Sequence, residues 1–224
     1  MNGEALLLSL RLSATVALLL QVIALPLAYA LAFAKWRGKF LVESVVALPL
    51  VLPPTVLGFY ALLAMGPRGP LGKLWQSLFG HPLAFTFAGL VIASLVYSLP
   101  FAVQPVATSF EALDRRLLDA SAVLGAGRMR TFFRVTLPLA WPGVLTALVL
   151  SFAHTLGEFG VVLMVGGNLP GITRTVSIDI YDRVQSLDYA GAQQTALFLL
   201  LICFVVLSIV YGVNRRVWSP WPAR

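Results

Sequence analysis

The sequence predicts an all-α polytopic membrane protein with about five transmembrane helices. Hydrophobic residues make up 59% of the 224 residues and charged residues only 11%, and the mean hydropathy is +0.88. Soluble domains carry about 25% charged residues, so this chain could not cover a water-facing surface. Soluble and disordered folds are therefore excluded. The single cysteine, Cys203, also leaves no intrachain disulfide.

Five long runs without Asp, Glu, Lys or Arg carry this prediction: 12–34, 44–67, 74–110, 135–157 and 189–214. Each exceeds the roughly 20 residues that cross a bilayer as a helix. The runs are continuously apolar rather than alternating, which excludes barrel strands. We expect one membrane domain, 1–224, with spans at about 10–34, 42–65, 84–108, 136–158 and 190–213. A sixth short membrane segment, within 159–165 or 74–82, stays open.

Basic residues predict the orientation. Eleven of the sixteen lie between spans one and two, between spans three and four, or after span five: Lys35, Arg37, Lys39, Arg115, Arg116, Arg128, Arg130, Arg134, Arg215, Arg216 and Arg224. The positive-inside rule assigns these segments to the cytoplasm, so the N-terminus is expected outside and the C-terminus inside. The net charge of +7 then reflects topology and contact with anionic lipid, not nucleic-acid binding.

A small-x-small pattern at Ala28-Tyr29-Ala30 raises the alternative of a cleaved signal peptide. The apolar run before it is long for such a peptide, and three basic residues follow directly and would resist export. An uncleaved first span is therefore favoured.

A proline cluster interrupts the second span. Pro49, Pro53 and Pro54 fall within six residues and are followed by Thr55. Proline removes a backbone donor and kinks its helix, so this segment is not expected to stay straight. The prolines either shape the bundle or mark a broken helix that lines a path for a polar solute. The candidate pathway residues here are Pro49, Pro53, Pro54 and Thr55.

Three further polar residues are candidates for a pathway or gate. Glu158 ends the fourth charge-free run, and His154 lies one turn earlier on the same helical face. At the edge of a span, a carboxylate can simply reach water. If it faces the bundle instead, it is costly and suggests a gate or a helix-positioning role, for which Arg174 would be a partner.

The segment 111–134, between spans three and four, is amphipathic. Leu113, Leu117, Ala120 and Leu124 fall on one helical face, and Gly125 then supplies a helix end. Periodicity alone does not separate a helix on the inner leaflet from a helix that docks into a partner's groove.

This segment resembles the signature E-A-A-x3-G-x9-I-x-L-P of ABC importer permeases of type I. Here it reads Asp119-Ala120-Ser121, then Gly125, then Val135-Thr136-Leu137-Pro138, with Asp for Glu, Ser for Ala and Val for Ile. The resemblance implies a cytoplasmic coupling helix that sits in a cleft of an ATP-binding subunit. The residues it assigns to coupling are Leu117, Asp119, Ala120, Ser121, Leu124, Gly125, Ala126, Arg128 and Pro138.

The resemblance extends over nearly the whole chain and is strongest to molybdate importer permeases. It rests on the segments 49–58, 66–72, 124–128, 156–160, 168–175 and 180–189. Sulfate permeases share Leu-Gly-Glu-Phe-Gly at 156–160. The resemblance implies a homodimer in the inner membrane with two ATP-binding cassette subunits. It also implies a periplasmic or lipid-anchored molybdate-binding protein.

Alternatives stay open within and beyond this class. The solute could be sulfate, thiosulfate or tungstate, and an ATP-independent anion channel or facilitator is a different class. A membrane-embedded enzyme is disfavoured because the sequence has no catalytic Ser/His/Asp constellation and only two histidines, His81 and His154, far apart. It also lacks G-x-x-x-x-G-K-[ST], so ATP and Mg²⁺ are expected on the partner and no cofactor in this chain.

Overall fold

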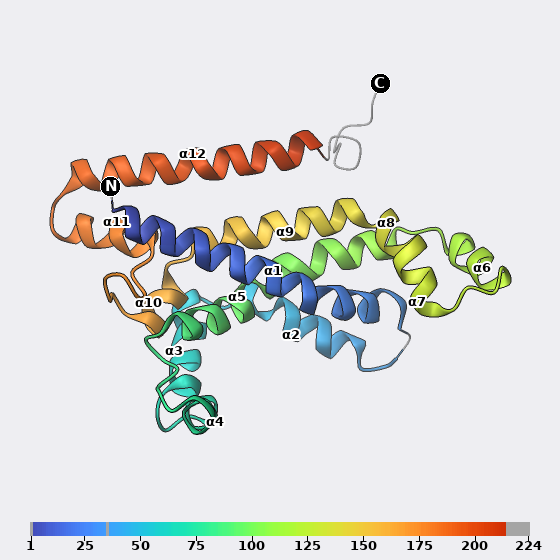
Figure 1. Ribbon diagram of the computed structural model, residues 1–224, viewed down its shortest axis with the longest axis horizontal. Helices are drawn as coiled ribbons and strands as arrows, with labels where there is room; N and C mark the ends of the chain where they lie inside the picture. Colours follow the sequence, from blue (N-terminus) through green and yellow to red (C-terminus); the bar gives the residue numbers. More distant parts are fainter. Residues whose placement is uncertain (1, 35, 214–224) are drawn as a thin grey trace.

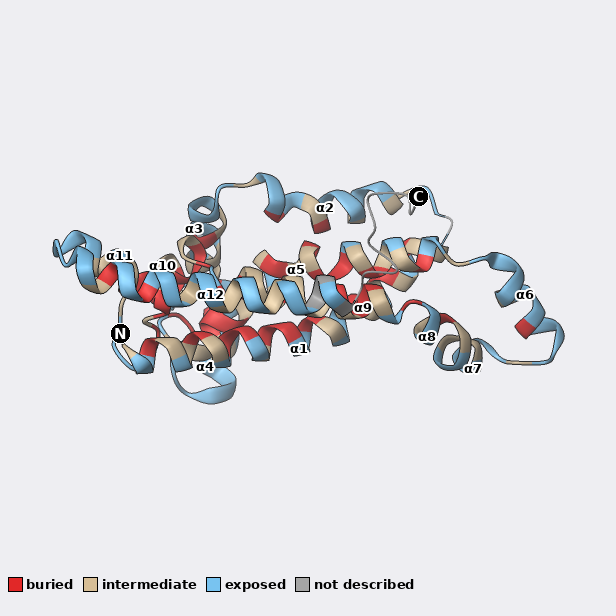
Figure 2. Ribbon diagram, turned by 90° about the horizontal axis from the view of Figure 1, so that it is seen from above, coloured by how far each residue is buried: buried red, intermediate tan, exposed pale blue. Residues whose placement is uncertain are grey.

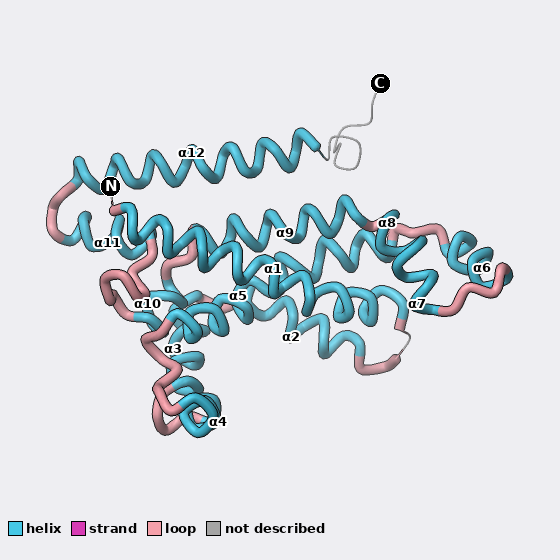
Figure 3. Tube along the Cα trace, in the orientation of Figure 1, coloured by secondary structure: helices cyan, strands magenta, loops and turns pink. Residues whose placement is uncertain are grey.

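The computed structural model describes residues 2–34 and 36–213, and within them the chain consists of helices joined by loops (Figure 3). The molecule is elongated, with its long helices running roughly along one direction (Figure 1). Four of the basic residues used for the orientation, Lys35, Arg215, Arg216 and Arg224, lie outside the described residues.

Three helices form the centre of the bundle: α1 (Gly3–Phe33), α5 (Phe87–Glu111) and α9 (Trp141–Leu156). They meet through small residues, among them Ala24 and Ala28 of α1, Ala102 of α5 and Gly143 of α9. A Cβ on Gly143 would lie 2.8 Å from the carbonyl oxygen of Pro105. Small residues let helix backbones approach closely, which is the main source of packing between helices in lipid.

Local signals explain where the central helices begin. The side chain of Asn2 accepts hydrogen bonds from the backbone N–H groups of Glu4 and Ala5 at the start of α1. Thr86 caps α5 by accepting from the backbone N–H of Gly89 at 3.1 Å. Both residues satisfy donors that a helix leaves free in its first turn.

The second expected span is not one helix. α2 (Lys39–Val51) and α3 (Pro54–Met65) meet at an angle of 112°. Pro53 and Pro54 stand at the break, where neither can donate a backbone hydrogen bond. The segment 42–65 is therefore bent at the proline cluster, as the sequence predicts.

The fourth expected span, 136–158, is also broken. A short helix α7 (Arg128–Thr131), a π-helical turn (Phe132–Thr136) and α8 (Leu137–Leu139) precede α9 at an angle of 70°. Pro138 and Pro142 flank this break and withhold two backbone donors. By length and composition, three described helices could cross a membrane alone, or up to five if each bent pair counts as one span.

Both candidate sixth segments are helical but short. α10 (Gly160–Gly166) has 7 residues and α4 (Pro70–Phe79) has 10. At 1.5 Å per residue they extend about 10 and 15 Å, against about 30 Å of hydrocarbon. Neither is long enough to be a sixth span.

The remaining helices lie around the bundle. α6 (Arg115–Val123) projects from one end, whereas α10 and α11 (Val176–Gln185) lie near the beginning of α1 (Figure 1). α12 (Tyr189–Val213) runs beside the bundle and is largely exposed, as are α4 and α6, while buried residues gather in α1, α5 and α9 (Figure 2). α11 is not predicted from the sequence, because residues 166–188 carry turn signals.

Candidate functional site

The amphipathic segment forms α6, whose two ends are defined by specific residues. Asp114 caps the first turn by accepting from the backbone N–H of Arg116 at 3.0 Å. At the other end Gly125 adopts φ +76°, and the N–H of Ala126 bonds to the carbonyl of Ser121 at 3.1 Å. This is the left-handed helix end that glycine adopts without steric cost.

A side-chain hydrogen bond ties α6 to the next helix. The hydroxyls of Ser121 and Thr131 lie 2.7 Å apart, and Ser121 is buried. Sequence reasoning selected Ser121 but not Thr131, because nothing in the pattern brings a residue ten positions later against α6. The hydrogen bond holds α6 and α7 together, and residues 115–131 are called the hooked unit below.

This hooked unit presents apolar side chains to its surroundings. Leu124 is 86% exposed and Leu117 47% exposed. A groove of about 530 Å³ lies between α6 and the start of the broken fourth span. It is lined by Leu117, Ala120, Ser121, Leu124, Ala126, Arg130, Arg134, Val135 and Leu139. An exposed apolar groove rimmed by cations is typical of a surface that binds a partner.

The nine residues expected to contact the ATP-binding subunit do not all lie at the groove. Five of the nine line the groove, whereas Asp119 and Arg128 are exposed elsewhere on the hooked unit and Pro138 lies in α8. The apolar face is shorter than the periodicity predicted. Leu113 precedes α6 and packs against the main core instead of continuing that face.

The break between α2 and α3 carries the proline candidates. Pro53, Pro54 and Thr55 are exposed at the bend, while Pro49 is buried within α2. α10 packs across α3 here: a Cβ on Gly160 would lie 2.7 Å from the Cβ of Pro54. Gly160 therefore lets α10 lie directly against the bend, and no pattern in the sequence singles out this glycine.

Glu158 occupies the junction between α9 and α10 and does not reach water. Its side chain is 4% exposed, and Oε2 accepts a hydrogen bond from the hydroxyl of Ser94 on α5 at 2.8 Å. The other oxygen, Oε1, is buried and has no hydrogen-bond partner among the described residues. Of the two alternatives for Glu158, solvation at the edge of a span is therefore wrong, and the carboxylate faces the bundle.

His154 belongs to the same junction. Its Nδ1 lies 2.9 Å from the hydroxyl of Ser98, which also contacts Thr155 at 2.9 Å. The imidazole stacks on Phe101 with 3.9 Å between ring centroids. Ser94 and Ser98, one turn apart on α5, therefore join α5 to both ends of the α9–α10 junction. In the sequence, the four-residue spacing of Ser94 and Ser98 indicates that the two hydroxyls share one face of a helix.

Arg174 does not pair with Glu158. Its guanidinium donates to Asn168 and lies 3.7 Å from a carboxylate oxygen of Asp182. Asp182 is in α11, a helix that the sequence did not predict, so its carboxylate could not be chosen as the partner. Arg174 therefore fixes α11 to the preceding loop.

Two acids and one arginine fix the turn between α11 and α12. Arg183 donates to Asp179 at 2.9 Å and to Asp188 at 2.8 Å, and Asp179 raises the pKa of the guanidinium. The backbone N–H of Gly191 and then Arg183 lower the pKa of Asp188. Because this pKa is lowered, the contribution of Asp188 is present above the ordinary carboxyl range and is lost as the pH falls through the folded-state value.

At the opposite end, Lys39 links two spans. Its ammonium lies 3.2 Å from Glu43 and 3.7 Å from Glu111, the last residue of α5. Through the described part of the chain, no group of three or more His, Cys, Asp or Glu is placed to hold a metal ion. The geometry therefore offers a docking groove at one end and a polar junction at the other.

Residues 24–219 match the family described as binding-protein-dependent transport system inner membrane component. This match, together with the helical bundle and the groove beside the projecting α6, identifies the class of protein as a multi-pass inner-membrane permease. The chain belongs to this family, and the sequence-based prediction of an ABC importer permease is confirmed.

Relatives place the chain more narrowly. It is 52% identical over 211 residues to the molybdenum transport system permease protein ModB of Azotobacter vinelandii, covering 94% of this chain and 93% of the relative. It is 38% identical over 221 residues to ModB of Escherichia coli strain K12, covering 99% and 93%.

Solved structures share the fold. A bacterial ABC transporter involved in the import of the acidic polysaccharide alginate matches with TM-score 0.77 at 18% identity, covering 96% of this chain and 79% of that chain. The MetNI methionine ABC transporter in an inward-facing conformation matches with TM-score 0.71 at 17% identity, covering 96% and 95%. The predicted all-α permease fold is therefore confirmed.

Proposed function

We propose that the chain is the permease subunit of an ATP-driven importer that moves molybdate across the inner membrane by alternating access. The observation that carries this proposal is the 52% identity to a molybdenum permease over 94% of the chain. A second candidate solute is sulfate, because a probable sulfate transport permease of Chlorella vulgaris is 34% identical over 175 residues. The identity favours molybdate.

The groove on α6 would couple ATP hydrolysis by the partner subunit to movement of the permease. Leu117 and Leu124 offer apolar surface, and Arg130 and Arg134 offer charge, to an ATP-binding cassette subunit that supplies ATP and Mg²⁺. One such subunit would dock on each copy of a permease homodimer. The chain itself performs no hydrolysis, and its role is to change between two arrangements that the partners favour differently.

The basic residues at the end that carries α6 also support a membrane orientation. α6 and α7, with Arg115, Arg116, Arg128 and Arg130, project opposite the beginning of α1 (Figure 1). Because basic segments tend to stay in the cytoplasm, this end would face the cytoplasm, with the N-terminus outside and the C-terminus inside. A periplasmic or lipid-anchored molybdate-binding protein would then deliver the anion at the end formed by α4, α10 and α11.

The solute path would run past the two broken helices. The bend at Pro53 and Pro54 is held by α10, and α10 is held to α5 through Glu158 and Ser94. A small movement of α9 would therefore be passed to the bend. Glu158 serves here as a positioning residue, because an uncompensated carboxylate is a poor ligand for a dianion.

Reconstituted uptake tests this proposal. Proteoliposomes holding the permease, its ATP-binding subunit and its binding protein are expected to accumulate molybdate with ATP and not without it. A tenfold excess of sulfate should leave that uptake nearly unchanged. The matched control is an ATP-binding subunit whose P-loop lysine is replaced. Uptake without ATP would identify a facilitator, and stronger accumulation of sulfate than of molybdate would overturn the substrate assignment.

A further inference from the structure

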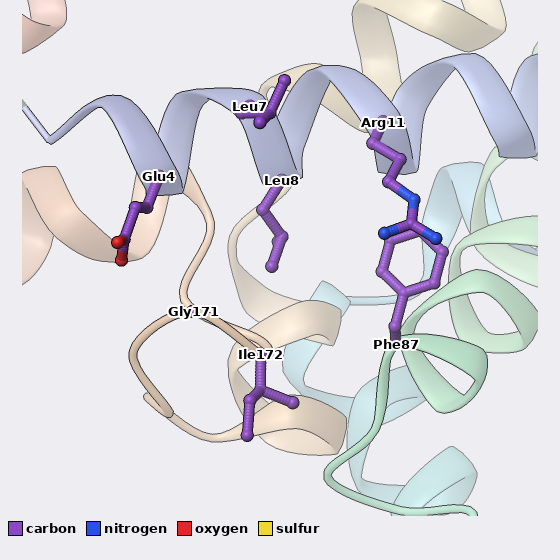
Figure 4. A pocket seen from close by; sticks show the side chains of 7 residues that line it. All are labelled: Glu4, Leu7, Leu8, Arg11, Phe87, Gly171 and Ile172. Carbon is purple, nitrogen blue, oxygen red and sulfur yellow. The ribbon is translucent and has the colours of Figure 1, made fainter.

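A pocket of about 430 Å³ lies at the N-terminal end of α1, away from the α6 groove and the Glu158 junction. It is lined by Glu4, Leu7, Leu8, Arg11, Phe87, Gly171 and Ile172 (Figure 4). The four lining residues of α1 follow the spacing i, i+3, i+4 and i+7, so they share one helical face. Phe87 begins α5, and Ile172 comes from the loop before α11.

The charges of this pocket are not used within the chain. The guanidinium carbon of Arg11 lies 4.8 Å from the centroid of the Phe87 ring. Among residues 2–34 and 36–213, neither Arg11 nor Glu4 is within 4.0 Å of an opposite charge. Arg11 therefore keeps its forked donors available for a planar or tetrahedral oxyanion.

The position of Arg11 along α1 matches the depth of lipid phosphates. The uncharged run after it, 12–34, has a helical length of about 34 Å, close to the hydrocarbon thickness of about 30 Å. Arg11 therefore lies at the hydrocarbon boundary. Glu4, seven residues earlier, lies about 10 Å further out, beyond the level of the phosphates.

The apolar surface continues inward from Arg11 on the same face. Leu18 and Val22 follow at seven and eleven residues, and they are 62% and 72% exposed. From the N-terminal end inward, this face of α1 therefore presents a carboxylate, a guanidinium and then exposed apolar side chains. A phospholipid with a primary amine has the complementary order of ammonium, phosphate and acyl chain.

We propose that this pocket binds the headgroup of a phosphatidylethanolamine-type lipid from the outer leaflet. Arg11 binds the phosphate, Glu4 accepts hydrogen bonds from the ammonium, and one acyl chain lies along Leu18 and Val22. Phosphatidylglycerol would satisfy Arg11 but bring no cation to Glu4. Phosphatidylcholine would bring a quaternary ammonium without hydrogen-bond donors. The proposal rests on the proposed membrane orientation but not on which solute is transported.

Native mass spectrometry of the purified full chain tests it, with dioleoyl forms of the three lipids supplied singly and in equal mixtures. The expected result is a preference for phosphatidylethanolamine of roughly tenfold, the effect of one charge-assisted hydrogen bond. Arg11→Gln should remove most adducts of all three lipids. Glu4→Gln should abolish the preference while phosphatidylglycerol still binds. The matched control, Arg68→Gln, changes an exposed arginine outside the pocket and should change nothing.

Three results would overturn the proposal. Equal adducts of the three lipids with the unaltered chain would show that the headgroup is not read. Displacement of the lipid by millimolar inorganic phosphate or molybdate would show a site for a free oxyanion. If Arg11→Gln reduced the dimer or binding-protein capture with unchanged lipid adducts, the pocket would be a protein contact. Should Arg11→Gln not fold, the lipid preference of Glu4→Gln decides alone.

Discussion

Replacing Gly125 with valine is expected to abolish ATP-driven uptake while leaving the permease folded in the membrane. Gly125 has φ +76°, a conformation that a β-branched residue adopts only under strain of about 1–3 kcal/mol. A Cβ there would meet no atom within 4 Å, so no packing in the bundle is lost. The end of α6 would reorganise instead, and Leu124 would leave the groove.

The expected result for Gly125→Val is uptake below about a tenth of the unaltered rate, with unchanged elution of the purified permease. Asparagine tolerates the left-handed region, so Gly125→Asn should retain most uptake. Gly127→Val is the matched control, since Gly127 has φ −68° and open space. Full uptake by Gly125→Val would mean that the shape of this turn is not used in coupling.

Glu158→Ala is expected to reduce uptake by about tenfold or more and to lower the thermal stability of the permease. The change removes the acceptor for Ser94 and leaves a buried hydroxyl without its partner. Losing a buried hydrogen-bond partner costs about 1–3 kcal/mol, and 1.4 kcal/mol is a factor of ten. The α9–α10 junction would no longer be held to α5.

Two further variants separate the hydrogen bond from the charge. Glu158→Gln keeps the volume and an acceptor for Ser94, so it should retain most uptake. Adding Ser94→Ala to Glu158→Ala should cost little more, because the two residues act as one pair. Initial uptake rates and melting temperatures in detergent measure both effects. A Glu158→Gln variant as defective as Glu158→Ala would contradict the positioning role.

The helical architecture could be predicted because the bilayer imposes it. A run of more than 20 apolar residues has few alternatives to a membrane helix, and the runs at 12–34 and 189–214 became α1 and α12. The breaks were harder to place. Proline shows where a helix can bend, but the 112° angle between α2 and α3 depends on α10 packing across α3.

The site was predictable where local conformation decides it. Gly125 ends α6 because of its backbone, and Asp114 caps it, and both effects reach only a few residues along the chain. Burial of Glu158 and the pairing of Arg174 with Asp182 depend on segments folding back in space. Apolar periodicity carries no information on such contacts, so Arg174 was assigned to the wrong carboxylate.

The claim that the α6 groove receives the ATP-binding subunit on the inner side is tested most directly by thiol protection. Cysteine is introduced as Leu124→Cys, 86% exposed on α6, or as Leu187→Cys, 71% exposed at the other end, each with Cys203→Ala. A water-soluble maleimide should label both in the isolated permease. Binding of the ATP-binding subunit should protect only Leu124→Cys. Equal labelling of Leu124→Cys with and without that subunit would contradict the account.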